Sequence, residues 1–184
     1  MRQFKEKFPN FKIIHRSFAL IREPKDFDNM FGSREEAKNE ILEHWRHANK
    51  NDDLRRFNIE GMKKQTFLFP TSMNALHACK AAALVAGEDG YWDAFDALQN
   101  ALFVENKNIE NQEIIDSVMK TLSFDFDSWR GYYSSDKVKK GVLDDFSIAR
   151  KYGINSVPTL VVNEKNIIPG AQSLDKIIEN VGAI

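Results

Sequence analysis

The sequence has 184 residues, 42% of them hydrophobic, which is enough for one well-buried core or for one core carrying a helical insertion. Its 26 basic and 27 acidic residues give a formal net charge of -1 and are interspersed along the chain, which argues against a nucleic-acid or membrane-surface partner. No apolar run approaches the roughly 20 residues that a membrane-spanning helix needs, and the polar start at Met1 lacks the apolar core of a secretion signal. We therefore expect a cytoplasmic protein.

The first part of the sequence predicts a helix, a strand and a second helix. Phe4 and Phe8 are spaced to share one helical face before Pro9 ends it. Residues 11–21 form a β-branched and aromatic run that favours a strand. Ser33 and the glutamates that follow it are typical of a capping box at the start of a helix.

Residues 33–133 have almost wholly helical patterning, which predicts a helical insertion between two ends that contain strands. Three apolar stripes recur there at helical spacing and are separated by stretches rich in glycine and asparagine. The stripes are Leu76, Cys79, Ala83 and Ala86; Trp92, Phe95, Leu98 and Leu102; and Ile114, Ile115, Val118, Met119 and Leu122. Because most aromatic residues fall on such stripes, we expect Trp45, Trp92 and Trp129 to pack in a core.

The last fifty residues predict a helix, two strands and a final helix. Ser134 or Ser135 caps the first of these helices, and Gly153 stops it. Residues 159–162 and 166–168 are predicted strands joined by a tight hairpin, and Ser173 caps the last helix. Pro158 stands at the mouth of the first strand, where a residue without an N–H group is tolerated.

Several motifs in this order are similar to those of one known family. They are residues 15–20 after the predicted strand, residues 101–103 and 106–109 in the helical part, and residues 153–160 and 168–172 near the end. The chain resembles the DsbA-like thioredoxin domain of dithiol-disulfide isomerases, a branch that also resembles the 2-hydroxychromene-2-carboxylate isomerases. The resemblance covers essentially the whole chain. It implies an α/β, thioredoxin-like fold, with residues 1–184 as one domain that carries the insertion.

The resemblance also implies a site. The peptide bond before Pro158 would be cis, with Val157 and Pro158 as catalytic elements and Ser156, Val157 and Pro158 as substrate-binding residues. The expected partner is a protein or small molecule that bears a thiol or a disulfide, and no cofactor is expected. Two alternatives remain open: a glutathione-dependent isomerase of the hydroxychromene carboxylate type, in which a serine replaces the nucleophilic cysteine, and a redox-inactive adaptor that binds peptides.

The beginning of the family's pattern has no counterpart in this sequence. Such proteins open with a strand followed by a Cys-x-x-Cys motif, whereas this chain has one cysteine, Cys79, on an apolar stripe. Thiol-disulfide exchange needs an attacking thiolate and a resolving thiol, so Cys79 is predicted to be a buried core thiol. Without the first strand, two rows of backbone groups in the sheet would lack partners. We expect either that this sequence is an incomplete version of a longer protein or that the chain forms a homodimer whose second copy completes the sheet.

The histidines carry weaker signals. His44 and His47 are three residues apart on a predicted helix, but the neighbouring sequence offers no further ligand, so no metal site is predicted. His15 lies near the end of the predicted strand and could line an active cleft, although a structural role on a half-buried strand is the favoured interpretation.

Overall fold

A computed structural model describes residues 1–52 and 54–182. The chain divides into two compact units. One unit combines Met1–Leu20 with Leu143–Ile184, and the other is Ile21–Val142. Helix α8 (Asp136–Lys151) contributes residues to both. The predicted insertion of residues 33–133 into a single domain stays a prediction.

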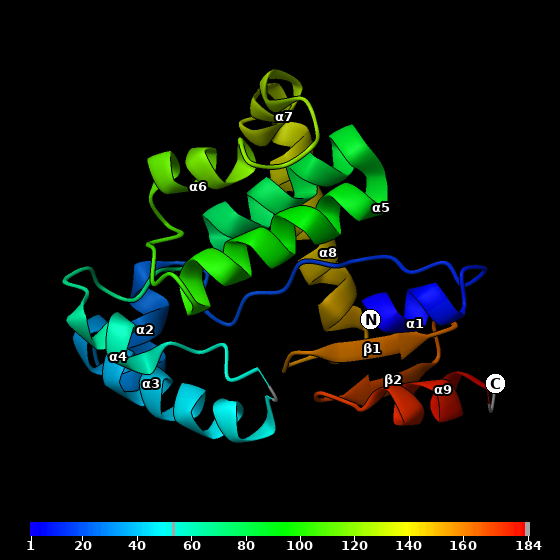
Figure 1. Cartoon of the computed structure of the whole chain (residues 1–184), viewed down its shortest axis with the longest axis horizontal. Helices are drawn as coiled ribbons and strands as arrows, with labels where there is room; N and C mark the ends of the chain where they lie inside the picture. The colour runs from blue at the N-terminus through cyan, green and yellow to red at the C-terminus, as the bar shows by residue number, and fades with distance from the viewer. Residues whose placement is uncertain (53, 183–184) are drawn as a thin grey trace. The chain divides into compact units, whose positions relative to one another are not determined.

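The first unit, called the mixed unit below, contains helices and a small sheet (Figure 1). Strands β1 (Thr159–Val162) and β2 (Asn166–Pro169) form an antiparallel hairpin. Its tight turn places Asn163 and Glu164 in the left-handed region, at φ 50° and 60°. Helices α1 (Arg2–Lys7) and α9 (Leu174–Gly182) pack against each other beside this hairpin. The predicted hairpin is confirmed, as are the helix that precedes it in the chain, α8, and the helix that follows it, α9.

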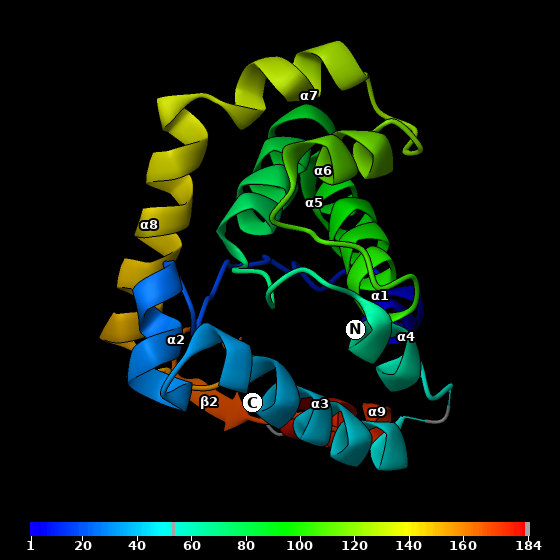
Figure 2. The same cartoon turned by 90° about the vertical axis from the view of Figure 1, so that its left-hand side faces the viewer.

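The second unit, called the helical unit below, contains no strand in its described residues (Figure 2). Its helices are α2 (Pro24–Phe31), α3 (Arg34–Asn51), α4 (Ile59–Lys64), α5 (Met73–Phe103), α6 (Gln112–Met119) and α7 (Phe126–Tyr133), followed by the start of α8. Helices α6 and α7 both pack against α5. The core of the unit includes fully buried side chains from five helices, namely Phe27, Met62, Cys79, Ile115 and Trp129.

Serine caps fix the starts of three helices where the sequence predicts them. The hydroxyl oxygens of Ser33, Ser135 and Ser173 accept hydrogen bonds from the backbone N–H groups three residues later, at 3.1, 3.3 and 3.3 Å. Each bond satisfies one of the N–H groups that have no partner within the helix. Of the two serines that could cap α8, Ser135 is therefore the one that does so.

The predicted strand at residues 11–21 is wrong. Burial alternates along this segment as it would in a strand, since Ser17 and Ala19 are buried whereas Arg16 and Leu20 are exposed. A strand also needs a neighbour that completes its hydrogen-bond ladder. Among the described residues the only ladder pairs β1 with β2, so the segment has no strand beside it to pair with.

The second predicted apolar stripe, which lies on helix α5, is only partly buried. The helix bends at Ala86 and Gly87, and Gly87 has φ 68° and ψ -158°, a conformation that is essentially restricted to glycine. After the bend the buried positions include Tyr91, Ala94 and Leu98, whereas Phe95 is 36% exposed. Leu98 and Leu102 of the predicted stripe are buried, so the face that meets the core runs through Tyr91 and Ala94 and leaves Phe95 outside it.

Candidate substrate-binding loop

The loop between α8 and β1 starts at a well-defined helix end. The N–H of Ile154 donates to the carbonyl of Ala149 at 2.9 Å, and the N–H of Gly153 donates to that of Arg150 at 3.0 Å. Gly153 has φ 64°, which a residue without a side chain adopts at little cost. This pair of bonds is the Schellman arrangement, and it satisfies carbonyls that the last turn would otherwise leave unpaired. The direction in which the chain leaves α8 is thereby fixed.

The three predicted site residues are adjacent in this loop and exposed. The peptide bond between Val157 and Pro158 is cis, the geometry that the family resemblance implies. Val157 is 52% exposed, although it is a large apolar residue. The Thr159 hydroxyl donates to the Ser156 carbonyl at 2.8 Å, and the Gly170 N–H donates to the Pro158 carbonyl at 2.8 Å. These bonds hold the loop to the hairpin, while the roles of its residues in binding or catalysis stay predictions.

The outer edge of β1, which faces away from β2, continues directly from this loop. Leu160 lies opposite Ile168 and Val162 opposite Asn166, in register with the bond between Gly170 and Pro158. Hydrogen-bonded pairs alternate along an antiparallel ladder, so Leu160 and Val162 turn their backbone groups toward β2. The backbone N–H and C=O groups of Thr159 and Val161 therefore point to the outer edge. Within the part of the chain described, no other strand pairs with that edge.

A buried carboxylate fixes the segment that the sequence predicts as a strand. Asp145 on α8 is 1% exposed, and its oxygens accept hydrogen bonds from the backbone N–H of Ser17 at 2.9 Å and from the Arg16 guanidinium at 3.0 Å. His15, in the same segment, is half-buried. Sequence reasoning missed Asp145, although its position was a usable signal. It stands three residues after Val142 and four before Ala149, so it lies on the apolar face of its helix.

Cys79 is a buried core thiol, as predicted. Burial raises the pKa of this thiol far above its ordinary value, because the charged thiolate would lose its hydration. The thiolate is the nucleophile in thiol-disulfide exchange. Cys79 therefore cannot serve as the attacking group while the helical unit is folded.

The raised pKa of Cys79 predicts a pH dependence of stability. An unfolded thiol releases its proton near pH 8.5, whereas the folded protein keeps it. Stabilisation by the neutral thiol is therefore fully present below about pH 8 and is lost as the pH rises. The expected loss approaches 1.4 kcal/mol per pH unit, because one proton separates the two states.

Urea unfolding between pH 7 and 10, under reducing conditions, measures this dependence. Wild type should lose free energy of unfolding more steeply than Cys79→Ala above pH 8.5, and both should follow the same slope below it. Parallel curves over the whole range would contradict the buried neutral thiol.

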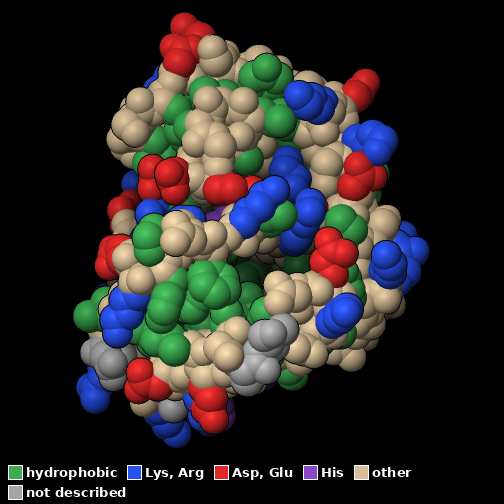
Figure 3. Space-filling model, turned by 90° about the vertical axis from the view of Figure 1, so that its right-hand side faces the viewer, with side chains coloured by type: hydrophobic (Ala, Val, Ile, Leu, Met, Phe, Trp, Pro, Cys, Tyr) green, Lys and Arg blue, Asp and Glu red, His purple; other side chains and the backbone are tan. Residues whose placement is uncertain are grey.

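The described residues also bear on metal and membrane binding. His44 and His47 are exposed on α3. Among the described residues, no three or more His, Cys, Asp or Glu side chains are grouped so that they could hold a metal ion. No helix in the described ranges is both long and apolar enough to cross a bilayer. Basic and acidic side chains are interspersed over the face shown in Figure 3.

Comparisons with known proteins find similarity over nearly the whole chain. The sequence profile of the DSBA-like thioredoxin domain matches residues 1–182. The crystal structure of a provisionally named protein disulfide isomerase from Nitrosomonas europaea superposes with a TM-score of 0.75 at 16% identity, covering 99% of this chain and 86% of that chain. The comparison with curated proteins finds no match. The fold is thus thioredoxin-like and, over the described residues, mostly helical with a small two-stranded sheet. The chain belongs to the DSBA-like thioredoxin domain family.

Proposed function

We propose that this chain binds an extended polypeptide bearing a thiol or a disulfide, as the substrate-binding part of a thiol-disulfide oxidoreductase or isomerase. The substrate would run along residues 156–158 and then along the outer edge of β1. Family membership supports the class of substrate. The observation that carries the proposal is the outer edge of β1, whose backbone groups at Thr159 and Val161 continue from an exposed loop.

Strand addition suits this arrangement. An extended peptide that pairs with a free strand edge gains main-chain hydrogen bonds, and pockets for alternate side chains supply specificity. Each such bond contributes about 0.5–1.5 kcal/mol net. The exposed side chain of Val157 would contact the peptide beside the reacting sulfur.

The redox step needs groups beyond residues 1–184. In a complete exchange cycle, a thiolate attacks one sulfur of the substrate disulfide, the other sulfur leaves as a thiolate, and a second thiol then resolves the mixed disulfide. The chain has one cysteine, and Cys79 is buried. The proposal therefore assigns recognition to this chain and requires a dithiol supplied from outside it.

Replacing Val161 with proline should weaken peptide binding about tenfold or more. Proline removes the outward N–H and places its ring against the incoming strand. Ile167→Pro is the matched control, because Ile167 lies directly opposite Val161 and turns its own N–H toward the far edge of β2. Binding is measured by calorimetry with an eight-residue peptide that carries one S-methylated cysteine, and circular dichroism checks that both variants fold.

Two further peptides make the test independent of the protein variants. One carries N-methyl groups on its odd-numbered amides and the other on its even-numbered amides. Only the peptide whose methylated amides face β1 should lose binding. Equal binding of both, or equal effects of the two proline variants, would exclude strand addition at this edge.

The same experiments separate the alternatives. Binding of S-methylglutathione without binding of the longer peptides would favour a glutathione-dependent isomerase. A dimer in light scattering that dissociates on Val161→Pro would mean that a second copy completes the sheet and occupies the edge.

A further inference from the structure

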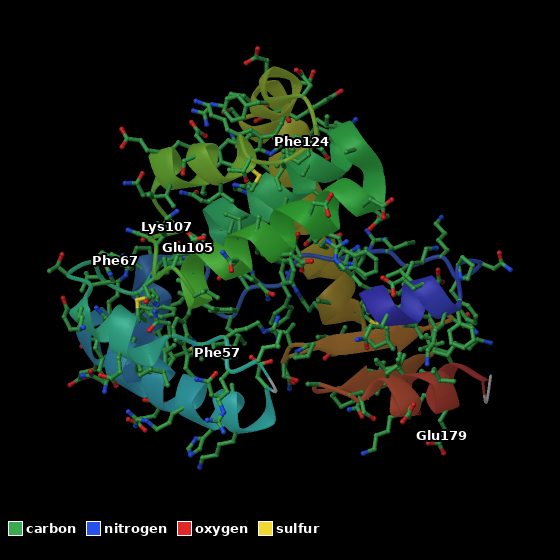
Figure 4. All side chains as sticks on the ribbon, in the orientation of Figure 1. Phe57, Phe67, Glu105, Lys107, Phe124 and Glu179 are labelled. Atoms are coloured by element: carbon green, nitrogen blue, oxygen red, sulfur yellow. The ribbon has the colours of Figure 1, made fainter. Side chains whose placement is uncertain are left out.

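The helical unit contains an open cleft that the proposed function does not use. It encloses about 610 Å³ and lies where the end of α3, the start of α4 and the end of α5 meet. Its lining includes Leu54, Arg55, Arg56, Phe57, Glu60 and Val104. Phe57 is labelled in Figure 4. Sites for small molecules commonly have 300–1,000 Å³, so the size fits one, and the lining mixes apolar side chains with charged and amide groups.

The floor of the cleft is held in place by several contacts. The Asn49 side chain donates to the Phe57 carbonyl at 2.8 Å and accepts from the Phe57 N–H at 3.1 Å. The Phe57 ring lies 5.6 Å from that of Trp45 and 4.7 Å from that of Phe103, between ring centroids. The Asn58 amide donates to the Val104 carbonyl at 3.1 Å. These contacts fix Phe57 and Asn58 on one side of the cleft.

Among the charged side chains that the structure describes in the cleft, one cation has no ion pair. Arg56 forms an ion pair with Asp52 at 3.1 Å, and hydrogen bonds from Arg56 hold the pKa of Asp52 below its usual range. Glu60 pairs with Lys63 at 2.8 Å. Among the described residues, no carboxylate lies within ion-pair distance of Arg55. Arg55 also has φ 47°, a left-handed conformation that costs free energy in a residue with a side chain and is common at functional sites.

We propose that this cleft binds a small monocarboxylic acid with an apolar body. The carboxylate would pair with the guanidinium of Arg55, which can hold both oxygens at once. The apolar body would cover Phe57 and two other apolar side chains, Leu54 and Val104, which are 76% and 39% exposed.

A single negative charge fits this cleft better than a phosphate monoester. One uncompensated guanidinium balances one anionic charge, whereas a dianion would retain an excess charge beside Glu60. The ligand also needs an apolar part, because two apolar side chains of the lining, Leu54 and Val104, are exposed in the described structure.

Naphthalene-2-carboxylate and its neutral carboxamide form a matched pair of probes. The acid should bind with a Kd on the order of 0.1–1 mM, as expected for a ligand of about a dozen heavy atoms. The carboxamide should bind about tenfold more weakly. Calorimetry gives the affinities, and quenching of tryptophan fluorescence reports on Trp45 beneath Phe57.

Two arginine variants assign the charge contact. Arg55→Gln should weaken binding of the acid about tenfold and leave binding of the carboxamide within twofold. Arg46→Gln is the control, because Arg46 is exposed on α3 and pairs with Glu43 outside the cleft. A cleft that does not recognise the carboxylate would give equal affinities for acid and amide, or the same affinities before and after Arg55→Gln. Absence of binding at millimolar acid would likewise overturn the proposal.

Discussion

Replacing Trp129 with alanine is expected to lower the free energy of unfolding by about 3–5 kcal/mol, the range for large-to-small changes of buried aromatic residues. The side chain is fully buried on α7, where its ring lies 5.4 Å from that of Phe126 and 5.1 Å from that of Tyr133. Its Nε1–H donates to the Ala78 carbonyl on α5 at 3.0 Å. The substitution would therefore remove both a packed ring and a bond between two helices.

Two further variants separate these contributions. Trp129→Phe keeps much of the apolar area and loses the donor, so it should cost about 1–2 kcal/mol. Tyr132→Ala is the control on the same helix, because Tyr132 is 38% exposed, and it should cost less than about 1 kcal/mol. Urea unfolding followed by circular dichroism at 222 nm measures all three. A cost for Trp129→Ala no larger than that for Tyr132→Ala would contradict the packing of α7 on α5.

Replacing Asp145 with alanine should destabilise the mixed unit by about 2–4 kcal/mol. The change leaves the buried N–H of Ser17 without its acceptor and removes the ion pair with Arg16. Arg16 itself is about half exposed and regains water, which keeps the cost below that of a fully buried pair. Asp145→Asn should cost less, because its amide oxygen can still accept one bond.

Hydrogen exchange gives a readout specific to this contact. The Ser17 amide should lose protection in Asp145→Ala, whereas amides in α5 should keep theirs. Glu179→Ala, which removes an exposed carboxylate from α9 of the same unit, should alter stability by no more than about 0.5 kcal/mol. An unchanged exchange rate at Ser17 would show that the carboxylate does not hold the segment.

Features set by local chemistry are the ones that the sequence predicts well. The serine caps and the stop at Gly153 depend on residues within one turn, and all are found where the sequence places them. Helix α2 is not among the predicted elements. It lacks a serine or threonine cap, and the Asp26 carboxylate instead accepts from the N–H groups of Arg22 and Glu23 at 2.8 and 3.1 Å.

Features set by distant contacts are the ones that the sequence misses. The segment at residues 11–21 has the composition of a strand, but a ladder depends on a neighbour that its own residues do not specify. The cleft beside Phe57 forms because Asn49 and Val104, far apart in the sequence, bind the same loop. For the candidate loop, the order of residues 153–158 predicts where an exposed site lies, whereas its continuation along β1 follows only from the register of the hairpin.

The burial of Cys79 has a practical consequence for spectroscopy. A cysteine introduced at an exposed site, as in Ser156→Cys, would be the one thiol of the native chain that reacts with a maleimide dye or a spin label. The wild-type residue would not have to be removed first, so the core stays intact. A probe at this position would sit at the mouth of β1 and report directly on whatever comes to lie there.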